Sequence, residues 1–162
     1  MIRAGDVSLL VESPPMDDIV KRWRLQGHVY LWRYKGDARN YPGWHLTADG
    51  PGCVSLLELI DLMGASRFSS EAQVPLSVPT EHQVGVPNAP LQHVPVRSLE
   101  LYHSPTKVAP DHWQLTENAG RARLELGTEK LTELRQGISD IARHEGDYSI
   151  GAQGQELWFW WR

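Results

Sequence analysis

Tryptophan side chains supply the most distinctive chemistry in this sequence. The chain of 162 residues holds seven tryptophans, several of them in the closing segment Leu157-Trp-Phe-Trp-Trp161. Indole rings bury large areas, stack on flat ligands and are enriched at protein interfaces. A second aromatic row, in which rings alternate with aliphatic residues, lies near residue 30. We expect a binding surface made of Tyr30, Trp32, Tyr34, Trp158 and Trp160.

The closing aromatic segment also has a purely structural interpretation. In a strand, Trp158 and Trp160 share one face, while Leu157, Phe159 and Trp161 share the other, so both faces are apolar. A central strand that is covered on both sides has this composition. An open aromatic face and a buried strand are therefore both consistent with the sequence.

Histidines raise the question of a metal site, for which His103, Asp111 and His112 form the most suggestive set. Zinc sites are usually recognised by short fixed spacings, such as two histidines four positions apart on a helix, or by cysteine pairs. Neither pattern occurs here. We therefore predict no metal ion and no cofactor.

The candidate nucleophile is Cys53, the single cysteine of the chain. It precedes an expected helix start, where the helix dipole can lower a thiol pKa. No histidine can be assigned as its base, so a small buried residue at a strand-to-helix turn is the favoured interpretation. Carboxylates between residues 129 and 145 alternate with basic residues, as on a solvated helix face. We nominate no catalytic residue.

Charge and hydropathy limit the classes of partner. The net charge is −4, and 41% hydrophobic with 22% charged residues is an ordinary globular composition. No basic stripe is present, which argues against duplex nucleic acid and anionic membranes as partners. The first residues lack a signal-peptide pattern, and the apolar window 54–63 is too short to span a bilayer. We expect a soluble, cytoplasmic protein.

One four-residue phrase occurs twice, as Trp44-His-Leu-Thr47 and Trp113-Gln-Leu-Thr116. A strand-like segment precedes each copy and a helical pattern follows it, which favours a degenerate internal duplication with halves at 28–64 and 98–146. Convergence of two short strands is the alternative explanation.

Two long helices are expected after these strands. Ser55-Leu-Leu-Glu58 has the spacing of a capping box, which predicts a helix from Ser55 to Gly64. Thr128 is the expected N-cap of a longer helix that stops at Gly146. Their apolar stripes have the same spacing. These stripes are Leu56, Leu59 and Met63 in the first helix, and Leu131, Leu134 and Ile138 in the second.

The remaining segments are expected to be short elements. Residues 7–11 are β-prone, and residues 16–23 have a helical period, with a hairpin as the alternative. Five prolines in the segment 66–96 predict an extended meander with at most edge strands. Residues 147–161 have the pattern of a terminal hairpin.

The sequence as a whole predicts a single α+β domain over residues 1–162. We expect a mostly antiparallel sheet with two main helices packed on one face. Surplus aromatic surface without a catalytic group favours a non-enzymatic, immunity-like or regulatory module that binds another protein or associates with itself. The alternative is a small-molecule-binding protein or hydrolase with a pocket, lined by histidines and aromatic rings, under the 66–96 meander.

Overall fold

The structure, a computed structural model, describes residues 16–35, 42–85, 92–94 and 96–161. The β-prone residues 7–11 lie outside the described residues. The described helices are α2 (Met16–Arg22), α3 (Gly50–Ala65), α4 (Glu81–Val84) and α5 (Thr128–Ala142). The described strands are β1 (Val29–Tyr34), β2 (Trp44–Ala48), β3 (Ser70–Pro75), β4 (His93–Val94), β5 (Ser98–His103), β6 (Trp113–Asn118), β7 (Arg121–Leu126), β8 (Tyr148–Ile150) and β9 (Leu157–Phe159).

The strands form two sheets rather than one. One sheet has the order β4-β1-β2-β9-β8 and the other the order β3-β5-β7-β6. Most neighbours are antiparallel, while β2 with β9 and β5 with β7 are parallel pairs. The α+β class with a mostly antiparallel arrangement and two main helices is therefore confirmed. The division into two sheets was not predicted.

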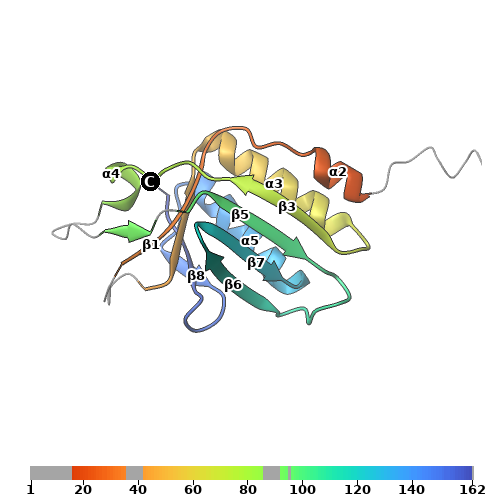
Figure 1. The fold of residues 1–162 in the computed structure, drawn as a ribbon. Coiled ribbons are helices and arrows are strands. Elements are labelled where there is room, and N and C mark those ends of the chain that lie inside the picture. The colour runs from red at the N-terminus through yellow and green to blue at the C-terminus, as the bar shows by residue number, and fades with distance from the viewer. Residues whose placement is uncertain (1–15, 36–41, 86–91, 95, 162) are drawn as a thin grey trace, which may run out of the picture.

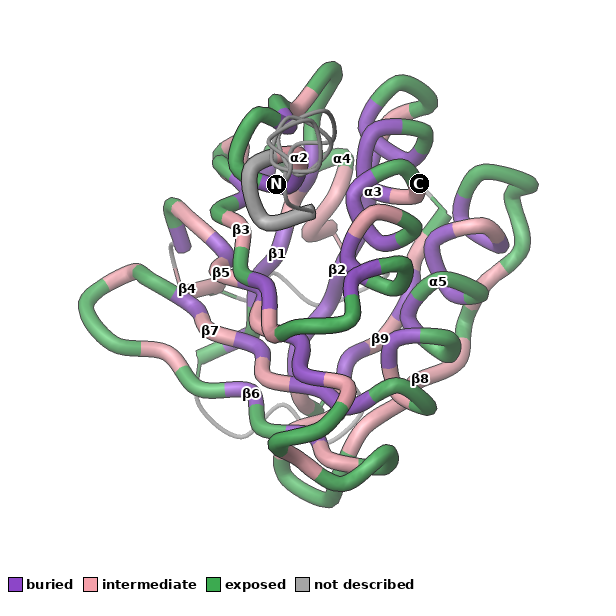
Figure 2. The backbone as a smooth tube through the Cα atoms, turned by 90° about the vertical axis from the view of Figure 1, so that its right-hand side faces the viewer, coloured by how far each residue is buried: buried purple, intermediate pink, exposed green. Residues whose placement is uncertain are grey.

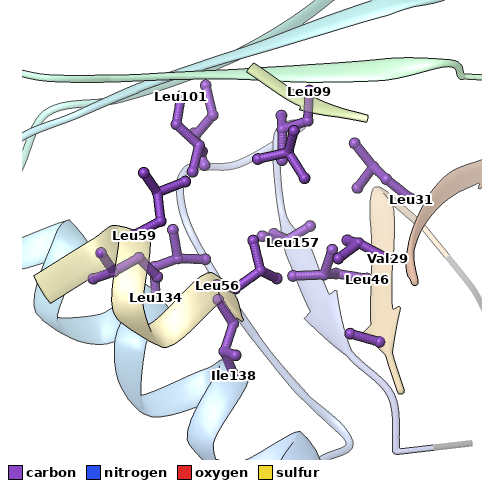
Figure 3. Close-up of a cluster of buried hydrophobic side chains, with 14 of the residues drawn as sticks. Val29, Leu31, Leu46, Leu56, Leu59, Leu99, Leu101, Leu134, Ile138 and Leu157 are labelled. Atoms are coloured by element: carbon purple, nitrogen blue, oxygen red, sulfur yellow. The ribbon is translucent and has the colours of Figure 1, made fainter. Parts of the chain in front are cut away.

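Both sheets and both long helices enclose one apolar core. Figure 2 shows α3 and α5 on one side and the strands of the four-stranded sheet on the other, with β2 and β9 between them. Leu31 and Leu46 reach this core from one sheet, Leu101 from the other, and Leu56 and Leu134 from the helices (Figure 3). The remaining gap among these side chains is about 10 Å³, which leaves no room for a ligand.

The start of α3 differs from the prediction, because the helix begins at Gly50 rather than Ser55. The Asp49 carboxylate caps it by accepting a hydrogen bond from the Gly52 N–H at 2.8 Å. An aspartate followed by proline in the first turn is itself a helix-start signal, and it prevails over the capping-box spacing. Ser55 lies inside α3, and its hydroxyl accepts a hydrogen bond from the Gln26 N–H at 3.0 Å.

Both predicted ends of α5 are also wrong. Gly127 occupies the N-cap position in place of Thr128. The position requires glycine, because a side chain there would overlap the carbonyl oxygens of Ala109 and Pro110. The helix ends at Ala142 rather than Gly146. His144 takes the left-handed backbone conformation, with φ 59°, and so turns the chain before the glycine is reached.

The repeated phrase has similar local structure in both copies but a different position in the fold. Trp44 and Trp113 each begin a strand and are buried. However, β2 lies inside its sheet between β1 and β9, whereas β6 is the outermost strand of the other sheet and pairs with β7 alone among the described strands. The internal duplication is therefore not shown.

The remaining short elements agree largely with expectation. The predicted helix is present at residues 16–22 in place of the alternative hairpin, and the proline-rich meander contributes β3 and β4, each the outermost strand of its sheet. The helical turn α4, labelled in Figure 1, was not predicted. The terminal hairpin is present as β8 and β9, and β9 also pairs with β2, which the sequence pattern did not indicate. None of the described helices is long and apolar enough to cross a membrane.

Candidate functional site

The predicted binding residues lie together on the outer face of the five-stranded sheet, around His45. Register places Trp32 opposite His45 and His45 opposite Trp158. The His45 ring centroid lies 5.7 Å from that of Trp32, 5.1 Å from that of Tyr34 and 5.5 Å from that of Trp160. We call Tyr30, Trp32, Tyr34, His45, Trp158 and Trp160 the His45 layer.

Hydrogen bonds set the chemistry at the centre of the His45 layer. The Trp160 Nε1–H donates to Nδ1 of His45 at 2.6 Å, so Nδ1 must carry a lone pair rather than a proton. The Thr47 hydroxyl holds the same strand end by donating to the Trp160 carbonyl at 2.6 Å. Metal-ligand spacing did not indicate His45. The available signal was the alternation of β2, which places the His45 ring on the same face of the sheet as the rings of β1.

Burial makes most of the His45 layer a second small core. Trp32 and Tyr34 are 0% and 6% exposed, while Tyr30, Trp158 and Trp160 are half-buried. The meander covers part of this face, because the Tyr34 hydroxyl donates to the Val84 carbonyl at 2.8 Å. The structure thus brings all five predicted residues together but leaves only three of them partly accessible.

A cleft of about 420 Å³ opens next to the His45 layer, with Tyr30 in its wall. We call it the α4 cleft. Its walls come from β1, the end of β2, the start of α3, the turn α4, the end of α5 and the C-terminal segment. The lining residues are Tyr30, Ala48, Asp49, Gly50, Cys53, His82, Gln83, Ile141, Ala142, His144 and Trp161.

Asp49 is the fixed polar group of the α4 cleft. Its Oδ1 accepts hydrogen bonds from the backbone N–H of His28 at 2.9 Å and of Gly52 at 2.8 Å. Gly27 lies so close to Asp49 that a side chain at this position would overlap the carboxylate, and its φ is 81°. Glycine therefore makes this close approach possible. The carboxylate is therefore held in place before any ligand arrives.

The end of α5 also lines the α4 cleft and is held by side-chain hydrogen bonds. Asp140 accepts hydrogen bonds from the Tyr148 hydroxyl at 2.6 Å and from Gln136 Nε2 at 2.8 Å. These donors, with Arg143, hold the pKa of Asp140 below its usual value, the Tyr148 bond being the main cause. The bond ties the helix end to β8 and fixes the backbone that leads to His144.

Cys53 lines the α4 cleft but is unsuited to nucleophilic attack. Its side chain is 1% exposed, and burial, assisted by the nearby Asp49 carboxylate, raises the pKa of the thiol to about 11. The thiol is protonated at neutral pH, and the thiolate is the reactive form. The position two residues before a helix N-cap was wrong, because Cys53 is already inside α3.

The histidines do not converge on one centre. His82 and His144 line the α4 cleft, whereas His103 is fully buried at the end of β5. Burial lowers the pKa of His103. His112 instead lies 3.5 Å from the carboxylate of Glu125. Within the described part of the chain, no three histidine, cysteine or acidic side chains are placed to hold a metal ion.

Comparison with known proteins adds no assignment. No protein-family model, no curated protein sequence and no solved structure matches this chain. The α4 cleft and the His45 layer are therefore the features of this chain that bear on its function.

Proposed function

We propose that this protein binds a small organic molecule in the α4 cleft, without covalent catalysis. The observation that carries the proposal is the cleft itself, which has the volume of a small-ligand site and is lined by Tyr30, His82, His144 and Trp161. A few polar groups among apolar walls are typical of such sites. The expected setting is the cytoplasm, where a lone cysteine stays reduced.

Two observations favour a cleft over an open aromatic face. Trp32 and Tyr34, two of the five residues expected on that face, are buried. Within the part of the chain that the structure describes, the large exposed apolar side chains are Val54, Phe68, Val78 and Trp161, which come from four separate segments. Recognition of a protein partner through Tyr30, Trp158 and Trp160 stays a prediction.

Cys53 is in a state that opposes covalent catalysis. It is the nucleophilic thiol among the residues that line the α4 cleft, and its raised pKa keeps it protonated. A hydrolase that used this thiol would need a base to remove its proton. The carboxylate of Asp49 instead raises the pKa of Cys53, which opposes formation of the thiolate.

The test is a screen of single-ring compounds by protein NMR. We expect some compounds at millimolar concentration to shift the backbone signals of Gly50, His82 and His144 together, since these residues line one cleft. Ala142→Trp should abolish those shifts by filling the cleft from α5. Thr132→Trp, at an exposed position of the same helix, should leave them unchanged. Shifts that survive in Ala142→Trp, or no shifts with any compound, would contradict the proposal.

A further inference from the structure

The ligand class can be deduced from the walls of the α4 cleft, on the basis of the proposed function. Four ring side chains from different elements line it: Tyr30, His82, His144 and Trp161. The His144 and Trp161 rings stand nearly perpendicular, at 86°, with centroids 6.2 Å apart. Aromatic walls favour a flat guest, because faces and edges of rings stack well on planar groups.

The charge of the α4 cleft is negative. Among the described residues that line it, Asp49 is the one with an acidic or strongly basic side chain. The start of α3 and the end of α5 both border the cleft, and helix ends carry about +0.5 and −0.5 charge respectively. These two partial charges are opposite in sign, so Asp49 contributes the formal charge, −1, of the described lining residues.

The Asp49 carboxylate acts on Cys53, another residue that lines the cleft. The raised pKa of Cys53 has the Asp49 carboxylate as its second cause after burial. Both backbone hydrogen bonds to the carboxylate end on Oδ1. A carboxylate with two oxygens can accept further hydrogen bonds, so a donor group of a ligand can bind without breaking the helix cap.

Arg143, the nearest cation in sequence to His144, is directed elsewhere. Its guanidinium lies 2.6 Å from Asp140 Oδ1 and 3.9 Å from Glu145 Oε2. It does not line the cleft. The negative charge of Asp49 is therefore not neutralised by this guanidinium.

We infer that the α4 cleft selects a small planar cation, of the class of amidines and protonated heteroaromatic amines. The positive group of the ligand pairs with the Asp49 carboxylate. Its ring lies among the aromatic walls that include Tyr30 and Trp161. Cations also interact favourably with aromatic faces, which adds to the same preference.

Three probes of matched shape test this inference: benzamidinium, neutral benzamide and benzoate. Binding is measured by titration calorimetry at pH 8, with NMR shifts at Gly50 and His144 to locate the site. We expect benzamidinium to bind at least about tenfold more tightly than benzamide, since a hydrogen bond to a charged group is stronger than a neutral one. Benzoate should bind more weakly still.

Asp49→Asn removes the charge and keeps the cap, because asparagine caps helices as well as aspartate does. We expect this variant to lose the preference for benzamidinium over benzamide. Asp61→Asn removes a carboxylate of the same helix that pairs with Arg135, outside the cleft, and should keep the preference.

The other outcomes separate failure of the ligand class from failure of the cleft as a ligand site. Benzoate binding as tightly as benzamidinium, or a preference that survives in Asp49→Asn, overturns the ligand class and leaves the site standing. Binding of none of the three probes overturns the ligand class. The broader compound screen then decides separately whether the cleft is a ligand site.

Discussion

At the scale of single residues, burial decides what the chemically suggestive side chains can do. Cys53 and His103 attracted attention in the sequence for their reactivity and metal affinity. Both are buried. Burial raises the pKa of Cys53 and lowers the pKa of His103, and both shifts favour the neutral side chain. Asp49, the N-cap residue of α3, was not among the predicted site residues and holds the formal charge of the described α4 cleft lining.

The buried thiol gives the first prediction. With a pKa of about 11, Cys53 should react with iodoacetamide at pH 8 on the order of a hundredfold more slowly in the native protein than in urea. Mass spectrometry of timed samples measures both rates. Native and unfolded rates within a few-fold of each other would show that the thiol is accessible and ionised.

His103 gives a prediction about pH. Its pKa is lowered in the folded state from an ordinary value of 6.5, so the unfolded chain takes up a proton first as the pH falls. Stability from this group is complete above about pH 6.5 and decreases below it, by up to about 1.4 kcal/mol per pH unit.

The measurement is the free energy of unfolding in urea between pH 7.5 and 5. His103→Phe should flatten this pH dependence, because phenylalanine keeps a ring of similar size and does not titrate. The exposed His82→Gln should not change it. An equal slope in His103→Phe and in the unaltered protein would contradict the assignment.

At the scale of elements, one glycine sets the contact between α5 and β9. Gly137 faces the Phe159 ring so closely that a methyl group at this position would overlap it. Gly137→Ala should lower the free energy of unfolding by about 1–2 kcal/mol, the cost of overpacking less the gain in helix propensity. Urea denaturation measures the change.

Gly64→Ala in α3 is the matched control. The nearest atom to a new methyl group there is Leu131 Cδ2 at 3.5 Å, an ordinary contact. This substitution should be neutral or stabilising by up to about 1 kcal/mol. If both substitutions had the same effect, the close packing of Gly137 on Phe159 would be refuted.

Gln155 joins the two sheets at the outer edge of β6. Its side-chain oxygen accepts a hydrogen bond from the Leu115 N–H at 2.7 Å, and its carbonyl accepts one from Trp113 Nε1 at 2.8 Å. Gln155→Ala should cost about 1–2 kcal/mol, because it leaves the Leu115 N–H unpaired. The exposed Gln153→Ala should cost nothing measurable in the same urea titration. Equal stability of the two variants would remove this role.

At the scale of the whole molecule, the local spacing of apolar residues predicted the helices and strands. Contacts between distant segments determined how these elements pair and pack. The period of two in 29–34 and the apolar stripe of α5 are local properties, and both elements are present. The parallel pairing of Leu46 with Phe159 joins residues far apart in sequence. No local pattern encodes such a pairing, so the two sheets were not foreseen.

The candidate site shows the same division. Strand alternation was sufficient to place Tyr30, Trp32 and Tyr34 on one face. The α4 cleft needs the start of α3 and the end of α5 to meet beside α4, and the predicted positions of these two helix termini were each displaced by several residues. His144 entered the site because its left-handed backbone ends the turn after α5.

The shared core gives a prediction for the whole chain. Side chains from both sequence halves and from β9 pack around Leu56 and Leu134, so no half has a core of its own. Unfolding in urea should be a single transition, with the same midpoint by tryptophan fluorescence and by far-ultraviolet circular dichroism. Two separated midpoints would show independent halves.

The most direct measurement is a crystal structure of the protein grown with benzamidinium. The account predicts the ligand in the α4 cleft, with its amidinium nitrogens at hydrogen-bond distance from Asp49 and its ring beside Trp161. A cleft filled by protein side chains, or benzamidinium bound elsewhere with the cleft open, would contradict it.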